Sequence, residues 1–161
     1  MPDSDDESES ERLNRNFDDL LQELRVSQNG TQILFAFLLT VPFSSGFKTV
    51  TSLERGVYFA ALILAGMSAA MLIAPAAMHR ILFREGLKKE LVAVATKVTL
   101  GGQLVLILAV TASVFLIGDY LYSTTAGIVL GALMAAYWAT WFLALPLAIR
   151  LYKRQPTADS S

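Results

Sequence analysis

Four polar side chains stand directly before an apolar run, where a membrane helix would insert more readily without them. They share one arc of a helix at about 100° per residue, and they are Arg25, Gln28, Asn29 and Gln32. The run that follows, residues 33–43, extends only roughly 16 Å, against a hydrocarbon thickness of about 30 Å. A helix that crosses a membrane here must carry these polar side chains into the bilayer.

Such a group supports two kinds of chemistry. It could bind an anion, a lipid headgroup or a protein partner, or it could hydrogen-bond to neighbouring helices, each bond contributing on the order of 0.6 kcal/mol. Four polar side chains near the ends of other apolar segments could complete the cluster: His79, Arg80, Lys97 and Gln103. Three basic side chains between the second and third apolar segments could contact lipid headgroups or only fix orientation: Arg84, Lys88 and Lys89.

The composition argues against an enzyme. The chain has no cysteine and one histidine, which removes thiolate nucleophiles and most metal sites, so we expect no metal and no cofactor. It has no Ser/His/Asp arrangement and no His-Glu metal motif, so we expect no catalytic residue. The basic residues are dispersed and not interleaved with aromatic residues, so nucleic acid is not an expected partner. The expected partners are the lipid bilayer and an anionic lipid or a membrane protein.

Four apolar segments must position these side chains. They cover about residues 26–47, 57–78, 98–118 and 125–149. The last three are about long enough to cross a membrane as a helix, whereas the first is too short without the polar residues before its apolar run. The short connections on one side make adjacent helices antiparallel neighbours. The sequence therefore predicts an all-α integral membrane protein, a four-helix bundle with up-down-up-down topology that forms a single domain over residues 13–155.

The distribution of charge predicts how this bundle is oriented. Eleven of the thirteen Lys and Arg residues lie before the first segment, between the second and third, or after the fourth. The other two connections hold only Lys48 and Arg55. Because basic residues near membrane helices stay on the cytoplasmic side, we predict a multi-pass protein of the cell membrane with both termini in the cytoplasm.

The segments outside the bundle differ in character. Residues 1–12 are rich in acidic side chains and residues 156–161 are polar, so both are expected to be disordered tails. After the first tail, apolar residues recur every three or four positions: Leu13, Phe17, Leu20 and Leu24. This spacing predicts an interfacial amphipathic helix over residues 13–25 that lies on the inner membrane surface.

Small residues predict where helices approach closely. Gly127, Gly131 and Ala135 recur every four residues in the fourth segment, and Gly66 and Ala70 do so in the second. Such a stripe accepts another helix, by default one of the same chain and alternatively one of a homo-oligomer. Three tyrosines are expected at the outer membrane interface: Tyr58, Tyr120 and Tyr122. Three prolines within apolar segments each remove one backbone donor: Pro42, Pro75 and Pro146.

Two stretches carry a resemblance to a known family. One is ELRVSQNGTQ at residues 23–32, which runs directly into ILFAFLLTVPF, and the other is Ala74-Pro75 followed by HRILFR at residues 79–84. They resemble the corresponding motifs of a family of small actinobacterial membrane proteins of unknown function. The resemblance implies four membrane helices, and some members carry an automatic label of sodium:proton antiporter. This sequence departs from that label because its apolar segments contain no Asp or Glu to bind the ion.

Two functions therefore stand as hypotheses. The first is a non-enzymatic membrane protein that binds a partner or lipid through the polar cluster. The alternative is a transporter of an ion or small solute, which the missing carboxylate disfavours.

Overall fold

The computed structural model describes residues 9–82 and 88–153, and within these ranges every regular element is a helix. The long helices are α1 (Glu9–Thr40), α2 (Ser52–Leu82), α3 (Lys88–Leu121) and α4 (Thr124–Ala139). Two 3-10 turns, η1 (Val41–Phe43) and η2 (Ser45–Thr49), connect α1 to α2. A π-helical turn, η3 (Thr140–Ala144), joins α4 to α5 (Leu145–Lys153). The all-α expectation is confirmed for the described residues.

Three stretches are long and apolar enough to cross a membrane: Ser52–Arg80, Glu90–Leu121 and Thr124–Leu151. They contain the predicted second, third and fourth segments. The helices run on beyond those segments, because α3 begins at Lys88, ten residues before the predicted 98–118. Most of the predicted middle connection is therefore helical. The predicted tail over residues 156–161 lies outside the described residues, as does most of the tail over residues 1–12, whose last four residues begin α1.

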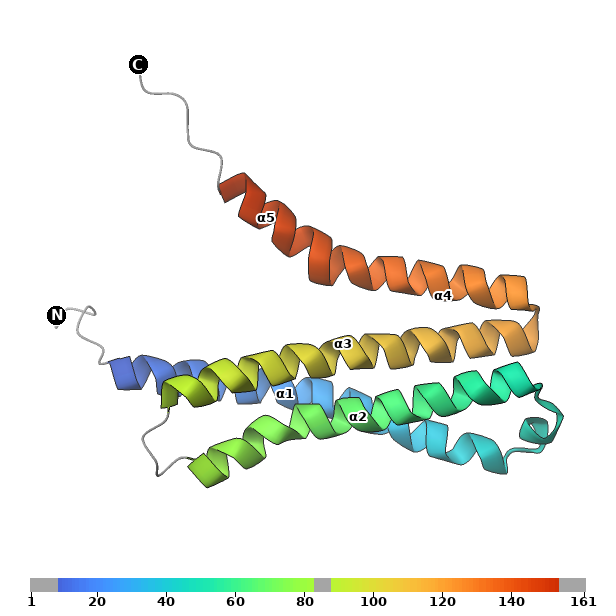
Figure 1. Cartoon of the computed structure of the whole chain (residues 1–161), viewed down its shortest axis with the longest axis horizontal. Helices are drawn as coiled ribbons and strands as arrows, with labels where there is room; N and C mark the ends of the chain where they lie inside the picture. The colour runs from blue at the N-terminus through green and yellow to red at the C-terminus, as the bar shows by residue number, and fades with distance from the viewer. Residues whose placement is uncertain (1–8, 83–87, 154–161) are drawn as a thin grey trace, which may run out of the picture.

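The helices lie side by side along one axis (Figure 1). α1 begins, α2 ends and α3 begins at the same end of the molecule, and α5 ends on that side too (Figure 1). We call this the basic end, because its helix termini carry Arg12, Arg15, Arg80 and Arg150. The opposite end holds η1, η2 and the turn from α3 to α4, and we call it the turn end.

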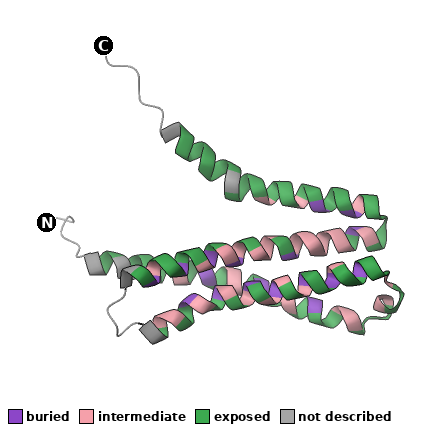
Figure 2. Ribbon diagram, in the orientation of Figure 1, coloured by how far each residue is buried: buried purple, intermediate pink, exposed green. Residues whose placement is uncertain are grey.

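The first helix is one unbroken rod of 32 residues. The sequence predicted two elements here, an interfacial helix over residues 13–25 and a membrane span from residue 26, but α1 shows no break between them. The reason is a continuous seam of buried residues that recur every seven positions: Phe17, Leu24, Thr31 and Leu38. A seven-residue repeat keeps one face of a helix on its neighbours over its whole length. α1 therefore packs along α2 and α3 from end to end, as Figure 2 shows.

The second helix has a regular seam as well. Its buried residues are spaced alternately four and three apart: Glu54, Tyr58, Ala61, Ala65, Ser68, Leu72 and Pro75. Several of these residues are small, and α3 also has small buried residues: Ala95, Thr99, Gly102 and Ala109. Small residues let two membrane helices approach closely enough for backbone contacts. The Ser68 hydroxyl accordingly donates a 2.9 Å hydrogen bond to the backbone carbonyl of Gly102 across this interface.

The last helix departs from the other three. α4 packs on α3 near the turn end, where Gly127 and Gly131 are buried, and then diverges (Figures 1 and 2). From residue 132 to residue 151 the described side chains are exposed, except the half-buried Met134 and Trp138. The rod also changes at η3, where Leu145 donates its backbone N–H to the Thr140 carbonyl five residues back. Pro146 explains this π turn, because a proline ring lacks a donor and clashes with the preceding helical turn.

Candidate functional site

The depth of the polar stretch of α1 is fixed by one hydrogen bond. The Gln28 side-chain amide donates to the backbone carbonyl of Leu72 at 2.7 Å. Leu72 lies six residues before Met78, the last residue of the apolar segment of α2, which corresponds to about 9 Å along a helix. The amides of α1 are therefore level with the apolar interior of α2 and not with its ends.

The contact adds a second hydrogen bond to a carbonyl within α2. Pro75 is buried and has no backbone N–H, but the carbonyl that it leaves without a helical donor is that of Met71, one residue before Leu72. The Leu72 carbonyl therefore accepts from Gln28 in addition to its place in the helix. Gln28 acts as an interhelical hydrogen-bond donor, which is the second of the two readings of the polar group.

Replacing Gln28 with leucine tests this role. We expect Gln28→Leu to lower the free energy of unfolding by about 0.6 kcal/mol, the typical contribution of a hydrogen bond between membrane helices. Reversible unfolding in mixed micelles measures it. Asn29→Leu is the matched control, because Asn29 is exposed and makes no hydrogen bond to the described residues. Equal effects of the two substitutions would contradict the assignment.

The other side chains of the α1 group face away from the bundle. Arg25, Asn29 and Gln32 are all exposed, and none of them makes a hydrogen bond or ion pair within the described ranges. The seam explains their position, because Leu24, Thr31 and Leu38 turn the opposite side of α1 inward. We call these three residues the amide face of α1.

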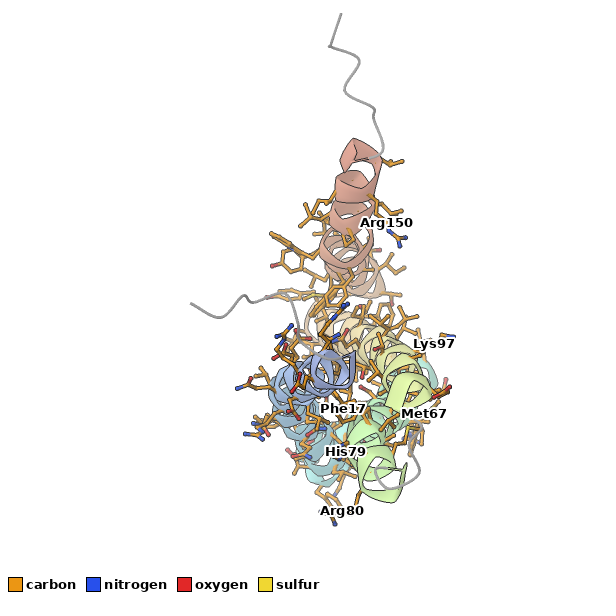
Figure 3. The ribbon with its side chains drawn as sticks, turned by 90° about the vertical axis from the view of Figure 1, so that its left-hand side faces the viewer. Phe17, Met67, His79, Arg80, Lys97 and Arg150 are labelled. Atoms are coloured by element: carbon orange, nitrogen blue, oxygen red, sulfur yellow. The ribbon has the colours of Figure 1, made fainter. Side chains whose placement is uncertain are left out.

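The predicted partners of this group do not gather around it. His79 stacks on Phe17, with ring centroids 4.9 Å apart, and so belongs to the contact between α1 and α2. Viewed along the bundle in Figure 3, Arg80 and Lys97 point outward on different sides of the molecule. Gln103 is half-buried in α3 and makes no hydrogen bond to the described residues. The structure thus brings together Gln28 with Leu72 and His79 with Phe17, and it places the exposed Arg80 and Lys97 apart from these contacts.

The candidate headgroup contacts are described only in part. Lys88 and Lys89 lie in the first turn of α3, on helical backbone and not in a loop. Arg84 lies outside the described residues.

The glycine stripes contact helices of the same chain. A Cβ atom added to Gly66 would lie 3.3 Å from the ring of Phe35 in α1. A Cβ atom added to Gly127 would lie 2.8 Å from the carbonyl oxygen of Phe115 in α3. Gly131 also faces Phe115, whereas Ala70 and Ala135 are exposed. Each stripe therefore packs through its glycines and leaves its alanine uncovered.

Tyr58 has a role that the sequence analysis did not foresee. It was expected at the outer membrane interface, but it is only 1% exposed, and its hydroxyl donates a 2.8 Å hydrogen bond to the Leu38 carbonyl of α1. In a continuing helix that carbonyl would bond to the N–H of residue 42, which is proline. Tyr58 therefore supplies the donor that Pro42 lacks. The available signal was a proline near a helix end facing a tyrosine on the next helix.

A pocket of about 490 Å³ lies at the turn end, between α1, η1, η2, α2 and α3. We call it the turn-end pocket. Its wall includes Glu54, which is 7% exposed and is the one buried carboxylate among the described residues. Glu54 accepts a 2.6 Å hydrogen bond from the Thr51 N–H, and the Thr51 hydroxyl accepts one from the Glu54 N–H. This reciprocal pair is a capping box, and its Thr-x-x-Glu spacing was visible in the sequence.

A family model matches residues 6–146, from before α1 to the start of α5. It describes DUF6328, a family of unknown function. The chain belongs to this family. The sequence matches no curated protein, and it matches no solved structure.

The DUF6328 region contains both the amide face and the turn-end pocket. The amide face carries amides and one guanidinium, and the pocket is lined mostly by apolar side chains. Among the described residues, no three His, Asp or Glu side chains lie close enough to share a metal ion.

Proposed function

We propose that this chain is a non-enzymatic membrane protein that binds a second membrane helix through the amide face of α1. The partner that fits best is α1 of a second copy. In this proposal the chain crosses the cell membrane four times, and both termini lie in the cytoplasm with the basic end. The observation that supports this proposal most directly is that Asn29 and Gln32 are exposed at the depth where α2 is apolar.

The contacts between α1 and α2 support a crossing by α1. α1 alone is too polar to rank among the three helices that are apolar enough to cross. It nevertheless follows α2 through three successive contacts, from Gln28 at Leu72 to Phe35 at Gly66 and Leu38 at Tyr58. If α2 crosses the bilayer, α1 crosses beside it, and its outward face meets lipid.

An uncovered amide in lipid is costly, and this cost supports a partner. A polar group without a hydrogen bond costs several kcal/mol in hydrocarbon. Arg25 lies nearer the basic end and can extend its long side chain to the interface. Asn29 and Gln32 have shorter side chains that cannot reach the interface. Hydrogen bonds to a polar group on a neighbouring helix would therefore remove the free-energy cost of leaving these amides unpaired.

The shape and chemistry of the face support a second copy as that neighbour. An amide side chain both donates and accepts hydrogen bonds, so the same face on two chains can pair around a two-fold axis. Gly30 lies about 100° around the helix from Asn29, and a Cβ atom added there would meet nothing within 4 Å. The exposed side chains of Val26 and Ile33 lie between Asn29 and Gly30 on the helix surface and add apolar contact beside the amides.

Energy transfer between labelled chains in vesicles tests this proposal. The chain has no cysteine, so Ser161→Cys provides a single labelling site. We expect energy transfer above the level of random proximity, and Asn29→Leu/Gln32→Leu should weaken association by about ten- to fiftyfold, since two to four lost bonds contribute about 0.6 kcal/mol each.

Thr96→Leu is the matched control for this experiment. It replaces an exposed polar residue of α3 whose hydroxyl bonds to its own helix, at the Val92 carbonyl, so association should be unchanged. Gln28→Leu should also leave association unchanged, because that side chain is occupied by Leu72. Random-level transfer in the unmodified protein, or full transfer in the double variant, would overturn the proposal.

A further inference from the structure

The turn-end pocket lies at the opposite end of the bundle from the basic end and has no part in the proposed self-association. It has a volume of about 490 Å³, within the range of about 300–1,000 Å³ typical of small-molecule sites. Its long wall is α1 from Leu34 to Val41, which covers about 10 Å along the helix axis. Leu116 and Ile117 of α3 form the facing wall. The pocket is thus an elongated space parallel to the helices.

Most of the polar side chains in the wall already bond within the protein, whereas the hydroxyl of the exposed Tyr120 makes no hydrogen bond to the described residues. The Ser113 hydroxyl donates to the Ala109 carbonyl at 2.8 Å, and the Ser44 hydroxyl donates to the Val41 carbonyl at 2.7 Å. The Glu54 carboxylate accepts from the Thr51 N–H. These bonds leave few polar groups to receive a hydrogen-bonding ligand inside the pocket. An apolar occupant therefore fits the pocket best.

The pocket also has a rim that faces the surroundings of the bundle. Phe37 and Ile117 line the pocket and are 68% and 57% exposed. A molecule in the lipid phase can enter between side chains so placed without passing through water. The long shape, the apolar wall and this open rim together match a single extended hydrocarbon chain.

Two basic side chains at the turn end indicate the charge that the other end of such a molecule would carry. Of the thirteen Lys and Arg residues, Lys48 and Arg55 are the two that lie between the first and second apolar segments, and both are exposed at the turn end. Lys48 lies in η2 between Phe47 and Val50, which both line the pocket. Arg55 directly follows the pocket residue Glu54, whose own charge is turned toward Thr51. Both basic residues are thus chain neighbours of pocket residues, and their charges favour a negatively charged headgroup at the turn end.

We propose that the turn-end pocket binds the acyl chain of an anionic amphiphile, with its headgroup at Lys48 and Arg55. A free fatty acid and an anionic phospholipid share this chemistry. The pocket then holds one bound chain that is distinct from the lipid around the bundle.

Photolabelling in phosphatidylcholine vesicles tests this site. Three probes carry the same diazirine in one acyl chain: palmitic acid, phosphatidylglycerol and phosphatidylcholine. We expect the two anionic probes to modify pocket residues in Leu34–Val41 and Leu116–Leu121 more strongly than the outward face of α4. The ratio between palmitic acid and phosphatidylglycerol identifies the source of the chain, and the phosphatidylcholine probe reports the contribution of the headgroup.

Three substitutions distinguish labelling inside the pocket from labelling at the lipid-facing surface. Ile117→Trp fills the rim and should lower pocket labelling by about tenfold or more. Ile128→Trp is its matched control, because Ile128 is also 57% exposed but lies on α4, outside the pocket. Lys48→Gln should lower labelling by the anionic probes by about fivefold, the effect of about one basic side chain at a lipid surface.

The outcomes decide between a site and ordinary lipid contact. Equal labelling of the pocket and of α4, or labelling that Ile117→Trp leaves unchanged, would overturn the site. Equal labelling by all three probes, unaffected by Lys48→Gln, would overturn the anionic headgroup. If Ile117→Trp does not fold, Lys48→Gln still tests the proposal, because Lys48 is exposed and is not one of the residues that line the pocket.

Discussion

Replacing Gly127 with alanine should lower the free energy of unfolding by about 1–3 kcal/mol, the usual cost of overpacking a tight contact. The added Cβ atom would lie 2.8 Å from the Phe115 carbonyl oxygen and 2.9 Å from the Asp119 backbone nitrogen. Both atoms are backbone, so no side chain can turn aside and the two helices must separate. Because Gly127 and Gly131 are the buried residues of α4, the loss should fall on the attachment of α4 to α3. Unfolding in mixed micelles measures the loss.

Gly131→Ala is the matched control on the same helix. Its Cβ atom would lie 3.4 Å from the Phe115 Cβ atom, which is ordinary van der Waals contact. Alanine also favours helix over glycine by about 0.8–1 kcal/mol, so this substitution should be neutral or stabilising. If both alanines have the same effect, the close contact at Gly127 does not hold α4 in place.

Replacing Tyr58 with phenylalanine should lower the free energy of unfolding by about 1–3 kcal/mol, the cost of leaving a buried polar group unpaired. The substitution keeps the buried ring and removes only the hydroxyl that bonds to the Leu38 carbonyl. Pro42 cannot replace that donor. Tyr122→Phe is the control, because Tyr122 is 77% exposed and the same chemical change there should have little effect.

A double-mutant cycle identifies the cause of this loss. Pro42→Ala restores a backbone N–H at the position that normally bonds to the Leu38 carbonyl. In the Pro42→Ala background, Tyr58→Phe should therefore cost less by about 1 kcal/mol, the net contribution of one hydrogen bond. Coupling of this size between a proline and a tyrosine on different helices is expected only if both act on the same carbonyl. The same cost in both backgrounds would assign the effect of Tyr58 to packing alone.

The helical segments were predictable because membrane helices leave a strong composition signal. The second, third and fourth apolar segments lie within helices that are long and apolar enough to cross a membrane. The course of α1 was not predictable from apolar length. Its polar stretch suggested a change of direction near residue 25, but Gln28 bonds to α2 and Thr31 is buried within the seam. The seven-residue spacing from Phe17 to Leu38 was the signal for one continuous helix.

The sequence predicted one polar cluster, whereas the structure separates its members. A helical wheel put Gln28 on the same arc as Arg25, Asn29 and Gln32, but Gln28 lies nearest the buried seam and bonds to Leu72, while the others are exposed. His79 was counted as a polar group, but it stacks on Phe17. Which side chain is occupied depends on contacts between helices, and one chain's sequence does not contain the distances that decide them. The bond from Tyr58 to Leu38 was missed for the same reason, whereas the capping box of Glu54 with Thr51 is local and could have been read from its spacing.

The attachment of the last helix also has a mechanical consequence. α4 and α5 form a rod held to α3 near Gly127, and from there to Arg150 the rod extends about 35 Å at 1.5 Å per residue. It is therefore a lever with its fulcrum at the turn end. A rotation of about 10° at the glycine contact displaces Arg150 by about 6 Å over a rod of this length. The position of Arg150 is thus set by the angle between α4 and α3 at Gly127 and by the molecules that occupy the space between the diverging rod and α3.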